Sequence, residues 1–248
     1  GYPLLCGQPF ALLKGVQSLN DFFQKFKDTF IEKARWTYLT DGLKTTLIIT
    51  FFAVILGMVL GFIIAVIRTT HDKTGKLKIA NIIAHIYLTV IRGTPVVVQL
   101  LIIYFVVFGS VAINKIFVAV LAFGLNSAAY VAEIVRSGIM SIDNGQFEAG
   151  SSLGLNYSKT MIYIILPQAF KNVLPSLANE CIVLLKETSV AGYIAIADLT
   201  KGGDFIRSQT YEAFLPLIAV ALIYLVMVMV MTALVSRLER RLAKNDRR

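Results

Sequence analysis

Four long stretches of this chain contain no Asp, Glu, Lys or Arg, and they restrict the possible fold more than any other feature of the sequence. They cover residues 45–67, 93–114, 116–132 and 213–236. A bilayer core about 30 Å thick is crossed by roughly 20 apolar residues in a helix. Each stretch therefore suits one membrane-spanning helix, and the third reaches this length if Glu133 lies inside the protein rather than against lipid.

A fifth segment, residues 161–186, is long enough to span but is more polar, because it contains Lys171, Glu180, Pro167 and Pro175. A backbone that crosses lipid must satisfy its own hydrogen bonds, and these segments lack the two-residue alternation of a barrel strand. We therefore predict an all-α membrane protein with five transmembrane helices, over about 45–67, 93–114, 116–136, 161–186 and 213–236.

Composition excludes an ordinary soluble domain, since 56% of the residues are hydrophobic and only 16% are charged, against about 25% charged in soluble proteins. The net charge of +9 does not indicate nucleic acid, because a nucleic-acid-binding protein carries its basic residues on a water-facing module. The surplus of basic residues is better explained by membrane topology, so we expect no nucleic-acid partner.

Topology follows from the positive-inside rule, which places an excess of Lys and Arg on the cytoplasmic side. Five spans put the termini on opposite sides, and a cytoplasmic C-terminus leaves thirteen of the 24 Lys and Arg inside and ten outside. We predict an external N-terminus, a transmembrane domain over 37–241 and a basic cytoplasmic tail over 242–248.

The first 36 residues form a predicted N-terminal extension without the pattern of a signal peptide. Residues 19–35 place aromatic and aliphatic side chains on one helical face and charges on the other. This pattern is typical of a helix in the membrane interface, and equally of an amphipathic helix packed on its own protein. The two cysteines, Cys6 and Cys181, lie far apart in sequence, so neither a disulfide nor a metal site is favoured.

Between the third and fourth spans lies a loop of intermediate polarity over residues 137–159. Asp143 can cap a short helix, Gly145 and Gly150 permit close approach, and Gly154 with Asn156 supplies the left-handed positions that end one helix before another. Two short helices at a sharp turn are therefore predicted. They either form a docking surface or simply cap the helical bundle.

The residues of this loop and of the following segment keep a recognisable spacing. The sequence runs Glu148-Ala149-Gly150, then Gly154 after three residues, then Ile164, Leu166 and Pro167. This resembles the EAA signature of ABC-importer permeases, EAA-x3-G-x9-I-x-LP. One departure is Gly150, where that family usually has Ala.

From about residue 36 to 241 the chain is similar to permeases for polar amino acids. Further matching blocks are GLKTTL from Gly42, IRGTPVVVQLLIIYF from Ile91, NSAAYVAEIVRSGIMSIDNGQ from Asn126 and LPQAFKNVLPSLANECIVLLKETSV from Leu166. The resemblance implies a type I ABC importer in a bacterial inner membrane, with arginine, lysine, histidine or glutamine as the transported amino acid and alternating access as the mechanism.

The partners that this resemblance implies are a dimer of ATP-binding subunits, a second permease copy, identical or different, and an extracytoplasmic substrate-binding protein. It also implies that loop 137–159 is the coupling loop. Its expected docking residues are Asp143, Gly145, Glu148, Ala149, Gly150 and Gly154.

No G-x4-GK[ST] phosphate loop occurs in the chain, so we expect no enzymatic activity and no cofactor on it, with ATP and Mg²⁺ held by the partner ATPase. The alternative is a self-sufficient secondary transporter or channel. It is less favoured, because the halves of such transporters are usually related by an internal repeat and none is visible here. An exporter subunit is also disfavoured, because exporters usually carry six spans.

Polar side chains at membrane depth usually face a cavity or one another. In the third span they follow one helical face, at Asn126, Tyr130, Glu133 and Ser137, and in the fourth at Asn172, Ser176, Asn179 and Glu180. The two prolines of the fourth segment are expected to break its helix. The candidates for the substrate path are Gln99, Asn126, Tyr130, Asn179, Glu180 and Thr188.

Each candidate has a structural alternative. Asn126 is favoured as a contact between helices, and Glu133, which lies beside Arg136, as half of an ion pair within the bundle or with the loop. Glu180 has no obvious cation one turn away on the same helical face, because Lys171 and Lys186 lie at poorer spacing. If Glu180 lines the path, its carboxylate suits a cationic or amino group. Thr188 belongs to a polar break at the outer end, where Lys201 to Arg207 is also expected to contact the binding protein or to shape the vestibule.

Overall fold

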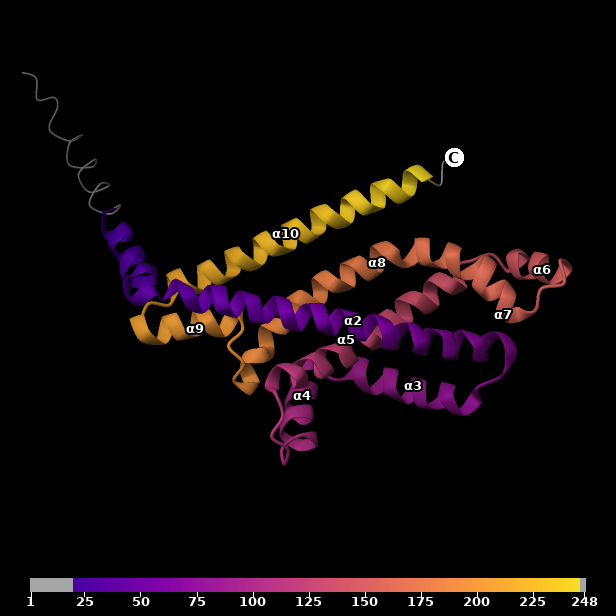
Figure 1. The fold of residues 1–248 in the computed structure, drawn as a ribbon, viewed down its shortest axis with the longest axis horizontal. Helices are drawn as coiled ribbons and strands as arrows, with labels where there is room; N and C mark the ends of the chain where they lie inside the picture. The colour runs from indigo at the N-terminus through magenta and orange to yellow at the C-terminus, as the bar shows by residue number, and fades with distance from the viewer. Residues whose placement is uncertain (1–19, 246–248) are drawn as a thin grey trace, which may run out of the picture.

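The computed structural model describes residues 20–245 of the chain, with side chains described from 20 to 241. Cys6 and the rest of residues 1–19 lie outside this range, as do residues 246–248 and the side chains of the predicted basic tail. The described chain is built of helices, with no strand in it. This confirms the predicted fold class. Figure 1 shows an elongated bundle in which the long helices run lengthwise and short helices lie at both ends.

Two helices form the centre of the bundle, α2 (Trp36–Thr74) and α5 (Lys115–Met140). The buried face of α2 carries mostly small residues, which lets the two backbones approach closely. At Gly61 an added Cβ would lie 2.6 Å from the Cβ of Val131 on α5. The close packing of α2 against α5 therefore depends on glycine at this position.

The second predicted span, 93–114, differs from the structure. A helix begins much earlier, α3 (Lys78–Gly93), and is followed by α4 (Val96–Leu101) and the π-helix η3 (Ile102–Val107), with a bend of 110° between the two halves. Thr94 precedes Pro95 and is extended, with φ −124° and ψ 146°, because a proline disfavours helical geometry in the residue before it. The absence of charges over 93–114 could not predict this bend, because a charge-free stretch indicates hydrophobicity and says nothing about the direction of the backbone.

The fourth segment consists of α7 (Tyr157–Thr160), the π-helix η4 (Met161–Ile165) and α8 (Leu166–Glu187). The predicted break at the prolines is wrong, since the helix runs from η4 past Pro167 and continues through Pro175 within α8. A proline inside a membrane helix is tolerated where neighbouring elements satisfy the freed backbone groups.

Beyond α8 the chain forms the 3₁₀ helix η5 (Thr188–Ile194), the short helix α9 (Leu199–Thr210) and the long helix α10 (Phe214–Asn245). Most large side chains of α10 are exposed, and the helix separates from the bundle toward its C-terminal end (Figure 1). It therefore presents an apolar surface to lipid or to another chain.

Within the described residues, three helices are long and apolar enough to cross a membrane, over Trp36–Thr74, Lys115–Met140 and Phe214–Arg241. The bent pair of Lys78–Gly93 and Val96–Val107 makes a fourth if it counts as one span. A spanning role for α8 stays a prediction, and so does the count of five.

The predicted amphipathic segment is not one regular helix. A helix over 20–26 leads into η1 (Lys27–Ile31) and η2 (Glu32–Ala34), where Lys33 has a positive φ of 54°. Phe22, Phe23 and Phe26 are exposed, whereas Phe30 is buried in a cluster with residues of α2, α9 and α10. Phe30 thus packs the segment against its own protein. The side chains of Phe22, Phe23 and Phe26 stay uncovered, which is compatible with the predicted position in the membrane interface.

Candidate functional site

An open polar cavity of about 590 Å³ lies between α5 and α8. The α5 side contributes residues three or four apart, which therefore share one helical face, and the α8 side does the same. The end of α3 closes one wall. The polar residues that line the cavity are Arg92, Tyr130, Glu133, Ser137, Ser141, Asn172, Ser176 and Glu180.

Glu180 stands in the wall of this cavity and is only 8% exposed. Its carboxylate accepts a hydrogen bond of 3.0 Å from the hydroxyl of Ser127 on α5. A carboxylate so far removed from water favours a cationic partner, because an isolated charge in a low-dielectric site is costly. The position of Glu180 suits recognition of an ammonium or guanidinium group.

Glu133 is the second acid of the cavity, and its predicted ion pair within the bundle is confirmed. It forms a salt bridge with Arg68 of α2 and lies 3.9 Å from the guanidinium of Arg92 on α3. Arg136 turns to α2 instead, where it pairs with Asp72 at 3.0 Å. The sequence did not name the partner of Glu133, because the neighbouring helices α2 and α3 supply the positive charges. The network ties α2, α3 and α5 together.

Arg92 is a cavity residue that lies just outside the predicted span over 93–114. Its guanidinium lies 5.8 Å from the ring centre of Tyr130, within reach of a cation–π interaction. Its position directly before the Gly93-Thr94-Pro95 sequence is the signal that could have found it, since a helix broken at membrane depth often borders a cavity.

Gln99 and Asn126 are buried and do not line the cavity. The Gln99 amide donates to the carbonyl oxygen of Ile91 at 2.7 Å and to that of Thr94 at 3.0 Å, and its oxygen accepts from the Asn126 amide at 3.0 Å. These bonds satisfy backbone groups that the end of α3 leaves open. The contact between helices expected for Asn126 is confirmed, and Gln99 stabilises the bend.

We predict that Gln99→Leu destabilises the protein by about 2–4 kcal/mol, since it leaves the Ile91 and Thr94 carbonyl groups and the Asn126 amide without partners. The denaturation midpoint of the purified protein in detergent measures this loss. Gln168→Leu is the matched control, because that glutamine is exposed and should change stability by less than about 0.5 kcal/mol. Equal midpoints for the two variants would contradict the role of Gln99.

The other two candidates also lie apart from the cavity. Thr188 is fully buried, and its hydroxyl donates to the Leu185 carbonyl oxygen at 2.7 Å and lies 3.4 Å from the hydroxyl of Thr50. Asn179 is exposed on α8. Of the six predicted path residues, the structure therefore brings only Tyr130 and Glu180 into the cavity wall, together with the polar residues that share their helical faces.

At one end of the bundle, α6 (Asn144–Ser152) and α7 form the predicted pair of short helices (Figure 1). The Asp143 side chain accepts from the Gly145 amide at 2.6 Å and caps α6, and Asn156 caps α7. Gly154 has a φ of +74° and ends α6. Two bonds complete the turn, Leu155 N–H to the Gly150 carbonyl and Gly154 N–H to the Ser151 carbonyl, the pattern of a Schellman motif.

The outer face of α6 is open to a partner. Glu148 and Ala149 are exposed, as is Leu153, at 78%. Lys73, in the last turn of α2, donates to the Asn144 side chain at 2.7 Å and lies over the ring of Phe147. Thus α6 is held against α2 on one side and remains uncovered on the other.

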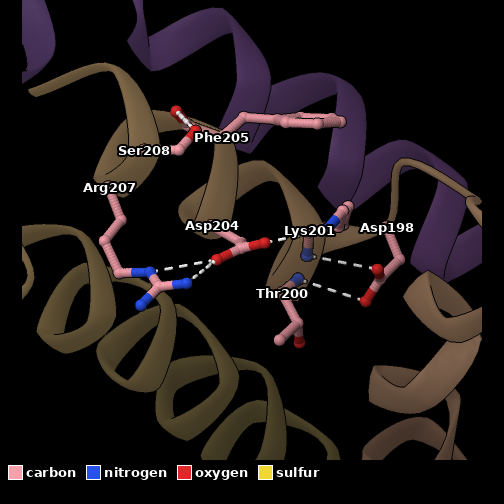
Figure 2. Close-up of polar contacts among 7 residues, drawn as sticks. All are labelled: Asp198, Thr200, Lys201, Asp204, Phe205, Arg207 and Ser208. Carbon is pink, nitrogen blue, oxygen red and sulfur yellow. Dashed lines mark hydrogen bonds and ion pairs between the residues drawn. The ribbon is translucent and has the colours of Figure 1, made fainter.

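A cluster of alternating charges lies on α9, at the opposite end of the bundle from α6 (Figures 1 and 2). Asp198 caps α9 by accepting from the backbone N–H groups of Thr200 and Lys201 (Figure 2). Asp204 accepts from the Lys201 ammonium at 2.8 Å and from the Arg207 guanidinium at 3.0 Å, and these hydrogen bonds lower its pKa from the ordinary value. A surface pocket of about 370 Å³ adjoins the cluster.

Among the described residues, no group of three or more His, Cys, Asp or Glu side chains is arranged to hold a metal ion. Cys181 is a free thiol. The polar lining of the cavity offers hydrogen bonds and charges to a solute.

A helical membrane protein with a polar cavity between its helices and an open two-helix turn at one end belongs to the class of membrane transport components. The comparison of sequences gives the family. Residues 57–244 match the family described as the inner membrane component of binding-protein-dependent transport systems, and the chain belongs to that family.

Relatives named as amino-acid permeases cover most of the chain. It is 39% identical over 211 residues to the arginine transport system permease protein ArtQ of Bacillus subtilis (strain 168), a match of 84% of this chain and 94% of that one. It is also 39% identical over 207 residues to the glutamine transport system permease protein GlnP of Escherichia coli (strain K12), covering 82% and 92%.

Solved structures agree with this assignment. A crystal structure of an amino acid ABC transporter with histidines matches with a TM-score of 0.77 and 43% identity, over 86% of this chain and 98% of that one. An inward-facing MetNI methionine ABC transporter matches with a TM-score of 0.70 and 20% identity, over 84% and 97%, and supports the fold.

Proposed function

We propose that this chain is the permease subunit of an ATP-driven importer that takes up polar amino acids by alternating access. The observation that carries the proposal is the polar cavity between α5 and α8, in a chain whose relatives are named as arginine and glutamine permeases. The chain supplies the path, and partner subunits bind ATP and Mg²⁺ and hydrolyse the ATP.

The substrate class is argued from the charges of the cavity. An amino acid carries an ammonium group, and Glu180 offers it a buried carboxylate. The guanidinium of Arg92 is 46% exposed and can meet an α-carboxylate, even though it lies near Glu133. A second positive group on the substrate, as in arginine, lysine or histidine, adds an attraction to the two acids of the cavity. Glutamine, with the same backbone groups, remains within the class.

We assign the partners to the two ends of the molecule. We propose that α6 and α7 dock on an ATP-binding subunit at the cytoplasmic face through Asp143, Gly145, Glu148, Ala149 and Gly154, whereas the predicted docking residue Gly150 is buried and faces its own chain. The α9 end then faces outward, where the cluster around Asp204 contacts the substrate-binding protein. A second permease copy completes the importer in the bacterial inner membrane, with the N-terminus outside and the C-terminus in the cytoplasm.

Reconstitution of the complex in lipid vesicles tests the function. Vesicles with the permease, its ATP-binding subunit and ATP inside should accumulate radiolabelled arginine, histidine or glutamine when the substrate-binding protein is added outside. Vesicles with the permease alone are the control and should show no flux above empty vesicles. Amino-acid flux through the permease alone would instead establish a self-sufficient transporter or channel.

A further inference from the structure

Gly150 is the buried residue of α6, whereas the other residues of this helix are exposed or half-buried. Beside it the rings of Phe147 and Tyr157 stack, with centres 6.2 Å apart and planes 10° from parallel. The helix α6 therefore rests on the rest of the chain through a small area, and Gly150 lies in the middle of it.

The atoms opposite Gly150 belong to Thr160. A Cβ added at Gly150 would lie 2.6 Å from Cγ2 and 2.7 Å from Oγ1 of Thr160, where ordinary van der Waals contact begins at 3.4 Å. Thr160 is 2% exposed, and its hydroxyl has no hydrogen-bond partner among the described residues. Because Gly150 has no side chain, the methyl and hydroxyl groups of Thr160 can pack against its backbone. The contact is van der Waals packing without a hydrogen bond from the threonine hydroxyl.

Thr160 connects the contact with Gly150 to the helix that lines the polar cavity. Thr160 is the last residue of α7, which continues without a turn through η4 into α8. The same α8 carries Glu180 in the wall of the polar cavity. A displacement of α6 against Thr160 is therefore passed to the beginning of the helix that lines the cavity.

We propose that Gly150 and Thr160 form a size-matched pair that sets the distance between α6 and the start of α8, and thereby transmits the movement of a partner docked on α6. The proposal rests on the docking role proposed above for α6. The EAA signature usually has Ala at this position, and the structure leaves no room for an alanine methyl group while Thr160 is in place. Both residues act through position, not through contact with the substrate.

The pair is tested with Gly150→Ala, Thr160→Ala and the double variant in the complete reconstituted importer. Gly150→Ala should lower the denaturation midpoint by about 5 °C, as overpacking does, and reduce uptake by about tenfold. Thr160→Ala removes the two nearest atoms and breaks no hydrogen bond among the described residues. By itself, Thr160→Ala should keep at least about half of the wild-type uptake. In the double variant it should restore most of the denaturation midpoint and most of the uptake that Gly150→Ala loses. Thr232→Ala, at an exposed position of α10 away from α6, is the control and should match the wild type.

Two results would overturn the proposal: wild-type stability and uptake in Gly150→Ala, or a double variant no better than Gly150→Ala. If Gly150→Ala does not accumulate in the membrane, the amount of protein recovered by adding Thr160→Ala is the same test, and no recovery rejects the pair. The midpoints require no transport, so they measure the fit independently. A wild-type complex without ATP-driven uptake would reject the proposed function, and the midpoints would still decide whether the pair exists.

Discussion

Replacement of Gly154 by Val is expected to reduce ATP-driven uptake by between about tenfold and 100-fold while the protein remains folded in the membrane. Gly154 has a φ of +74°, a conformation in which a β-branched residue is strained. The Schellman turn that ends α6 would open, and the α6 surface would lose its fixed angle to α7. Uptake in vesicles and ATP hydrolysis stimulated by the binding protein measure the effect.

The chain offers a matched control at Gly75, which ends α2 with a φ of +66°. An added Cβ meets nothing within 4 Å at either glycine, so both positions test backbone conformation without a clash. Gly75→Val should therefore cause a similar loss of stability, with much less loss of uptake. Equal loss of uptake in both variants would mean that Gly154 acts through general stability and not through docking.

Glu180→Gln is the second large effect. The substitution keeps the size of the side chain and an oxygen that can accept from the Ser127 hydroxyl, and removes only the charge. In the proposed path, the carboxylate of Glu180 pairs with a positive group of the substrate. Loss of one member of such a buried charge pair costs about 2–5 kcal/mol, so uptake of arginine should fall by about 30-fold or more. Uptake measured over a range of arginine concentrations tests this fall. Much of it should appear as a rise in the arginine concentration that gives half-maximal uptake.

Asn179→Ala is the control for Glu180, since Asn179 is the preceding residue of α8 and does not line the polar cavity. It should change uptake by less than about threefold. Unchanged uptake of every transported amino acid by Glu180→Gln would remove Glu180 from the path. A larger fall for arginine than for glutamine would indicate that this acid also contributes to substrate preference.

Local features of the α6–α7 region could be predicted from the sequence because they depend on neighbouring residues. The cap at Asp143 and the left-handed Gly154 each require one side chain or one glycine next to its own backbone. The polar faces around Tyr130 and Glu180 could be predicted for the same reason, since helical periodicity alone aligns their residues. The left-handed conformation predicted for Asn156 is wrong, since this residue has a φ of −76° and caps α7.

Features that depend on distant segments could not be predicted in this way. The partner of Glu133 could not be named from the sequence because α2 and α3 bring Arg68 and Arg92 to it, and no spacing along α5 reports their position. The boundaries of α3 were missed for a related reason, because Arg92 lies 3.9 Å from Glu133 and borders a cavity, so that it does not mark the end of a span.

The sequence by itself determined the membrane class, the helical fold and the short helices around Asp143 and Gly154, because hydrophobic length, backbone propensity and capping are local properties. The tertiary structure alone decided which polar residues meet in the cavity and that Gln99 and Asn126 stabilise the α3–α4 bend. It also decided that Gly150 faces Thr160. The physical reason is that burial and pairing depend on atoms from separate helices, and their distances exist only once the helices have packed.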